Sequence, residues 1–193
     1  MPAITDPRLL QQAVSYLDAA LNKVEVANYC QRRLAAVLES GEALRVEVQA
    51  YFEGMLYAGV AVTDQMAEVA NRAFALDLDR PNLRASLHAL RSRRLDPETA
   101  ELVTALDRWR RKPTVREAGT VRWRATHHYY SKEPREGAWF YEASDGIGVE
   151  EGGSVGLLAE AYVRELQALR DLIWRLASTV GAHEALTDLR DAR

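Results

Sequence analysis

The chain has little cysteine and no long hydrophobic run. Cys30 is the single cysteine among 193 residues, which excludes an intrachain disulfide framework and a metal cluster held by several thiolates. The longest uninterrupted apolar runs are only a few residues long, whereas about 20 are needed to cross a bilayer. The N-terminus has neither a basic start nor an apolar signal core. We therefore expect a cytoplasmic protein without a membrane partner.

The sequence does contain enough apolar material for a globular core. Hydrophobic residues make up 48% of the chain and charged residues 27%, values that are typical of soluble globular proteins. This composition excludes disorder as the main state, and the length fits one good-sized domain. We therefore predict a single domain over residues 1–193.

Apolar residues recur at spacings of three and four through most of the chain, which indicates helices. Helices are expected at 7–39, 42–76, 82–93, from 97 until Pro113, at 114–128 and at 155–180. Asp6-Pro7 and Asp96-Pro97 each supply an N-cap followed by proline at the first helical position. Two helices of more than 30 residues predict an all-α helical bundle with two long antiparallel helices.

Three local features modify this pattern. Residues 131–154 are rich in glycine, and Asp145-Gly146 lies between short apolar segments, so a loop or small β-hairpin insertion is expected there. Gly54 and Gly59 interrupt the second helix and would allow a close helix approach or a mild kink. The polar tail at 184–193 is expected to fray.

Positive charge is concentrated in one stretch of the chain. The net charge is −3, but residues 84–135 contain 13 Lys and Arg against 6 Asp and Glu. All but two of the basic residues are arginine, the side chain suited to bidentate phosphate contacts. An RNA or nucleotide partner would explain this stretch. Solvated helix faces that pair with acidic helices elsewhere would explain it equally well.

The same stretch contains an arginine followed closely by histidine. Arg122 precedes His127 with four residues between them, and His128 with five. Here the sequence resembles the HEPN superfamily, all-α helical bundles marked by an Arg-x(4–6)-His motif near the end of a late helix. The motif covers only seven residues, but the resemblance in architecture covers most of the chain: two long antiparallel helices, the motif-bearing helix and a closing helix.

This resemblance implies an RNA-binding protein and a metal-independent endoribonuclease of toxin type. It further implies a homodimer in which two motifs meet across a cleft, an antitoxin partner, and no cofactor or metal. Arg122 would stabilise charge on the phosphoryl oxygens. His127, or alternatively His128, would act as the acid or base on the ribose 2′-hydroxyl.

Further residues near the motif are candidates for binding the RNA backbone. These are Arg116, Arg124 and Tyr130. Residues 108–112 could also track phosphates, although a solvated helix end has the same composition. No His-x3-His or Glu-x-x-His pair is present, so no metal site is predicted.

Two other interpretations remain open. Trp123 stands where the HEPN family usually has a polar residue, and its bulk beside Arg122 favours a non-catalytic dimeric interaction module that binds a protein or nucleotide partner. Arg122 could also pair with a carboxylate, while His127 and His128 favour a helix C-terminus through its dipole. Cys30 falls in an apolar helical stripe and is expected in the core.

Overall fold

A computed structural model describes residues 4–40, 44–127, 143–144, 149–150 and 154–193. The helices of this part of the chain are α1 (Pro7–Glu39), α2 (Arg45–Ala73), α3 (Leu83–Arg91), α4 (Pro97–Arg110), α5 (Pro113–His127), α6 (Val155–Thr179) and α7 (His183–Asp191). The predicted all-helical class is confirmed. Two short strands, β1 (Ala143–Ser144) and β2 (Val149–Glu150), pair antiparallel. Apart from these strands and Ser154, the expected insertion lies outside the described residues.

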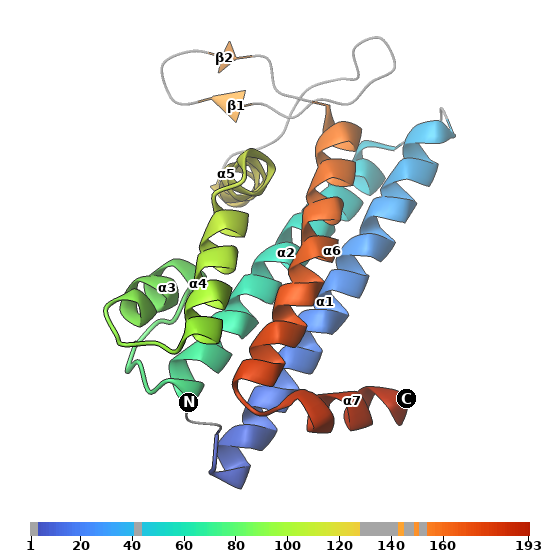
Figure 1. Ribbon diagram of the computed structural model, residues 1–193. Coiled ribbons are helices and arrows are strands. Elements are labelled where there is room, and N and C mark those ends of the chain that lie inside the picture. Colours follow the sequence, from blue (N-terminus) through green and yellow to red (C-terminus); the bar gives the residue numbers. More distant parts are fainter. Residues whose placement is uncertain (1–3, 41–43, 128–142, 145–148, 151–153) are drawn as a thin grey trace.

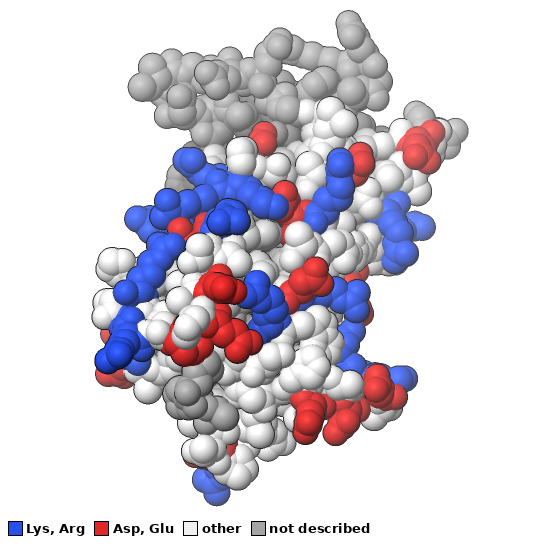
Figure 2. All heavy atoms as spheres, viewed as in Figure 1, with Lys and Arg blue, Asp and Glu red and all other residues white. Residues whose placement is uncertain are grey.

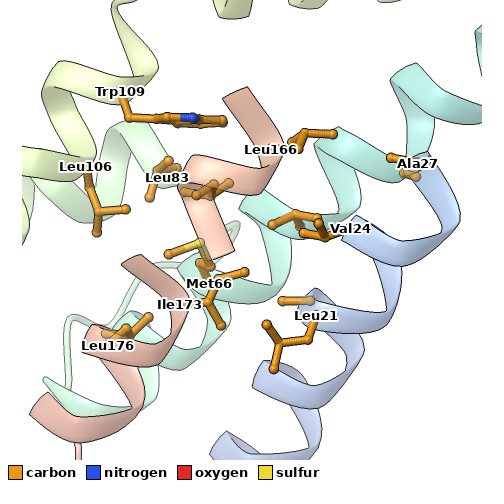
Figure 3. Close-up of a cluster of buried hydrophobic side chains, with 14 of the residues drawn as sticks. Leu21, Val24, Ala27, Met66, Leu83, Leu106, Trp109, Leu166, Ile173 and Leu176 are labelled. Atoms are coloured by element: carbon orange, nitrogen blue, oxygen red, sulfur yellow. The ribbon is translucent and has the colours of Figure 1, made fainter. Parts of the chain in front are cut away.

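Helices α1, α2 and α6 form the body of the molecule. Figure 1 shows α2 lying alongside α1, with α6 against them. Helices α3, α4 and α5 form a second group beside α2 and α6. The two groups share one hydrophobic core, because Leu83, Leu106 and Trp109 lie in the same buried cluster as Met66 and Leu166 (Figure 3).

The helix starts follow the capping residues that the sequence predicted. The carboxylate of Asp6 accepts a hydrogen bond from the backbone N–H of Arg8 at 2.8 Å, and Asp96 accepts one from Thr99 at 3.0 Å. These bonds satisfy donors that the first turn of a helix leaves unpaired. Hydrogen bonds from the backbone N–H and hydroxyl of Thr99 also lower the pKa of Asp96.

Helix α2 ends at Ala73, earlier than its apolar pattern predicted. Ala75 and Asp77 adopt φ values of 46° and 55°, in the left-handed region that breaks a helix. The side chain of Asn71 both accepts from the N–H of Leu78 and donates to its carbonyl. This side chain replaces helical hydrogen bonds and holds the turn that leads to α3.

Gly59 allows α6 to approach α2 closely. A methyl group at this position would lie 2.2 Å from the hydroxyl oxygen of Tyr162, which is far inside contact distance. The second helix remains continuous through the glycine. Of the two possibilities raised by the small residues, close approach is the one that occurs at Gly59.

The expectation that residues 184–193 fray is wrong. They belong largely to α7, and Leu186 is fully buried in the core. Arg190 and Arg193 form ion pairs with Asp18 of α1 at 3.3 and 2.9 Å. A third ion pair joins Arg190 to Glu25 of α1. Burial of Leu186 and these three ion pairs hold a mostly polar segment, which composition alone could not reveal.

Hydropathy adds one negative finding. None of the helices in the described ranges has a stretch that is both long and apolar enough to span a membrane.

Candidate nucleic-acid interface

Helix α5 carries the arginine of the predicted motif. Ala118 and Val121 are buried and fix the helix against the core. Arg122 follows them and is half-buried. Its guanidinium carbon lies 5.5 Å from the centre of the Tyr57 ring of α2, a cation–π distance. The ring of Tyr57 therefore fixes the position of the Arg122 charge.

The charge of Arg122 affects the pKa of two other side chains. Partial burial and the nearby Glu68 raise the pKa of Asp64, and Arg122 opposes this rise. Burial likewise raises the pKa of Tyr162 on α6, and Arg122 again opposes the shift. Arg122 therefore lies where α2, α5 and α6 meet, and its surroundings include an acidic and a phenolic group.

The other predicted site residues are described only in part. Arg116 is exposed on α5. Arg124 and His127 belong to the helical backbone of α5, but their side chains, together with all of His128 and Tyr130, lie outside the described residues. The structure thus places Arg116 and Arg122 on one helix and leaves the geometry between Arg122 and the histidines a prediction.

A second site, at the end of α4, centres on Asp107. Its side chain is only 7% exposed. Its carboxylate forms ion pairs with Arg91 of α3, Arg110 and Arg111, with N–O distances of 2.7, 2.7 and 2.8 Å, respectively. We call these four residues the Asp107 cluster. One carboxylate thus holds three guanidinium groups.

The electrostatics of the cluster explain why the carboxylate stays charged. Burial alone would raise the pKa of Asp107, and its position in the last helical turn opposes the helix dipole. Hydrogen bonds from Arg91 and Arg110, with the charges of Arg91 and Arg111, outweigh burial and hold the pKa below its ordinary value. The carboxylate is therefore ionised at neutral pH.

Positive charge remains in excess around Asp107. Within the described ranges, no second carboxylate lies at ion-pair distance from the three arginines. The neighbouring Lys112 is different, because it pairs with Glu165 of α6 at 2.6 Å. Figure 2 shows Lys and Arg atoms gathered along the side of the molecule where Figure 1 places α3, α4 and α5. We call this side the arginine-rich face.

The sequence analysis did not predict the Asp107 cluster, although it named residues 108–112 as possible phosphate contacts. Arg110 and Arg111 follow Asp107 at the helical spacings of three and four, which was a readable signal for local ion pairs. Arg91 comes from another helix, and no spacing in the sequence connects it with Asp107. Its participation depends on how α3 packs against α4.

Neither a metal site among the described residues nor similarity to a known protein assigns a function to these arginines. In the part of the chain that the structure describes, no three His, Cys, Asp or Glu side chains are grouped to hold a metal ion. Cys30 lies in the core as predicted, where burial raises its pKa. Comparisons of the chain with protein-family models, curated proteins and solved structures found no match. The side chains themselves are therefore the basis for a function.

Proposed function

We propose that the protein binds RNA along the arginine-rich face and cleaves it without a metal ion at Arg122 and His127, with His128 as the alternative histidine. The observation that supports RNA binding best is the excess of arginine over carboxylate in the Asp107 cluster. Phosphate contacts dominate the affinity of proteins for nucleic acids, and arginine forms them bidentately.

The proposed cleavage uses the RNA strand's own nucleophile. A neutral histidine takes the proton of the ribose 2′-hydroxyl, and the 2′-oxygen forms a bond to phosphorus while the bond to the 5′-oxygen breaks. The 5′-oxygen takes up a proton from a protonated histidine, so the products carry a 2′,3′-cyclic phosphate and a 5′-hydroxyl. Arg122 stabilises the charge on the phosphoryl oxygens.

The proposal follows the HEPN-like arrangement in its finer details. It includes α1 and α2 as the two long antiparallel helices, an insertion at 131–154, a homodimer that brings two motifs together, and an antitoxin partner. The contact with the Tyr57 ring supports the role of Arg122, because a cation–π interaction orients its guanidinium.

The test is cleavage of labelled RNA by the purified protein in excess EDTA. We expect the wild-type protein to cleave and the double variant His127→Ala/His128→Ala to lose the activity. The matched control is His88→Ala/His183→Ala, because both of these histidines are exposed on other helices. Equal cleavage by the wild type and the His127/His128 variant would overturn the catalytic assignment.

A second candidate function is a non-catalytic dimeric interaction module. Exposed apolar side chains favour it: Leu44 and Val46 at the start of α2 are 61% and 69% exposed, and Leu157 at the start of α6 is 69% exposed. We expect a second copy of the chain to cover them. Light scattering should then give a dimer mass that Val46→Glu lowers to a monomer, whereas a wild-type monomer would overturn this candidate.

A further inference from the structure

We propose that Arg91, Arg110 and Arg111, held around Asp107, bind the terminal phosphate monoester of an RNA strand. This inference rests on the proposed RNA binding but not on the proposed cleavage. It names a part of the substrate, the phosphorylated end, and a site for it that lies on α3 and α4 rather than at the Arg122 motif.

The charge of the cluster fits a monoester better than a diester. Three guanidinium groups and one carboxylate leave an excess of two positive charges. A phosphate monoester carries about −1.5 to −2 at neutral pH, whereas each diester of the RNA backbone carries a single negative charge. A terminal phosphate therefore neutralises the cluster, and an internal phosphate neutralises only half of it.

Accessibility and geometry also favour a ligand. The side chains of Arg91 and Arg111 are 43% and 64% exposed, so an anion can reach them. The printed contacts join one nitrogen each of Arg91, Arg110 and Arg111 to the two oxygens of a single carboxylate, while each guanidinium has five N–H donors. Asp107 thus fixes the side chains in place without using all of their donors, which lowers the entropic cost of binding.

Arg91 has a structural role that connects two helices, whereas Arg111 forms only a local pair at the end of its own helix. Arg91 connects α3 with α4 through Asp107, so its ion pair holds two helices together. Arg111 follows the same helix that carries Asp107, so its ion pair joins no other element. An exposed third arginine on an already paired carboxylate is what a ligand site would contain.

The site would distinguish substrates from products of the proposed cleavage. A 2′,3′-cyclic phosphate is a diester with one negative charge, and the opposite product end is a hydroxyl. Neither new end supplies the second charge that the cluster can neutralise. We therefore expect a phosphorylated RNA end to recruit the protein and the newly cut ends to be released.

The experiment measures binding of one fluorescent oligoribonucleotide prepared with a 5′-phosphate, with a 3′-phosphate or with hydroxyls at both ends, in EDTA. We expect at least one phosphorylated form to bind about tenfold more tightly than the hydroxyl form. Arg111→Gln and Arg91→Gln should each reduce this preference at least threefold. Arg164→Gln is the control, because Arg164 is an exposed arginine of α6 paired with Glu160.

The pH dependence of the binding preference is a second measurement. A purely structural role of the arginines predicts no such dependence. The second ionisation of the phosphate has a pKa of about 6, and arginine does not titrate in this range. The preference for the phosphorylated end should therefore shrink between pH 7.5 and pH 5, while the hydroxyl form changes little.

Equal affinity for all three oligonucleotides, or an unchanged preference in Arg111→Gln, would overturn the inference and leave cleavage untouched. Loss of cleavage in the histidine variant with an intact preference supports both proposals. If the wild type does not cleave RNA but still prefers phosphorylated oligonucleotides, only the proposed cleavage is overturned. Failure of every oligonucleotide to bind would overturn this inference together with the proposed RNA binding.

Discussion

Two buried aspartates hold arginines in this protein, and they differ in charge balance. Asp18 on α1 pairs with Arg190 and Arg193, and Glu25 supplies a second carboxylate to Arg190. Two carboxylates thus meet two arginines. Asp107 on α4 faces three arginines alone. The side chains of the two aspartates are almost equally buried, at 8% and 7% exposed.

The difference separates an internal contact from a site with capacity for a ligand. The balanced ion pairs at Asp18 attach α7 to α1, and their charges are satisfied within the fold. The ion pairs at Asp107 leave positive charge over, which favours an anion from outside. The balance of charges around a buried aspartate therefore indicates a ligand site better than its burial does.

The largest expected effect is that of Asp107→Asn on stability. The change leaves three guanidinium groups without their carboxylate, and we expect a loss of about 2 kcal/mol in the free energy of unfolding. Asp18→Asn should cost about 1 kcal/mol, because Arg190 keeps its pair with Glu25. Urea unfolding followed by circular dichroism measures both. A larger loss of unfolding free energy in Asp18→Asn than in Asp107→Asn would contradict the proposed difference between the two aspartates.

Inorganic phosphate sharpens the same comparison. In Asp107→Asn, an anion can take the place of the missing carboxylate among the arginines, so added phosphate should raise the melting temperature of this variant. Asp18→Asn should gain less, because Glu25 still balances Arg190. Chloride at equal ionic strength is the control. Equal gains for the two variants would indicate a general salt effect and contradict a specific site.

A smaller effect is expected from acid. The folded pKa of Asp107 is lowered from 3.8, so its carboxylate stabilises the fold fully above the unfolded pKa. This contribution is lost as the pH falls through 3.8 toward the folded pKa. The stability difference between wild type and Asp107→Asn should thus be constant above about pH 5 and shrink below it. A difference that grows toward low pH would refute the lowered pKa.

The smallest effect on stability is expected for Arg111→Gln. Its side chain is 64% exposed, and exposed ion pairs contribute less than about 1 kcal/mol. Arg190→Gln should destabilise more, because that side chain is only 20% exposed and holds α7. Chemical denaturation compares the two variants directly. If Arg111→Gln proved the more damaging, Arg111 would have a structural role after all.

The sequence predicted the helices well where local chemistry determines them. Asp6 and Asp96 began α1 and α4 as their capping side chains indicated. The pattern failed at the end of α2, where Asn71 binds the backbone of Leu78, and at α7, where Leu186 reaches the core. Both failures involve contacts made after the helices pack, which periodicity does not contain.

The site was predictable to a smaller extent. The concentration of arginine in residues 84–135 was evident from counting, but counting could not show which arginines share a carboxylate. Arg91 meets Asp107 only because α3 packs on α4. Arg122 was singled out by its spacing to His127, whereas its position over the Tyr57 ring depends on the packing of α5 against α2.

The measurement that tests the central claim most directly is the salt dependence of RNA affinity. For single-stranded RNA, each phosphate contact contributes about −0.7 to the slope of log K against log salt. The double variant Arg91→Gln/Arg111→Gln should therefore have a slope shallower by about 0.7, because the two arginines share one phosphate, while Arg164→Gln matches the wild type. Equal slopes for the wild type and the double variant would contradict phosphate binding by the arginine-rich face.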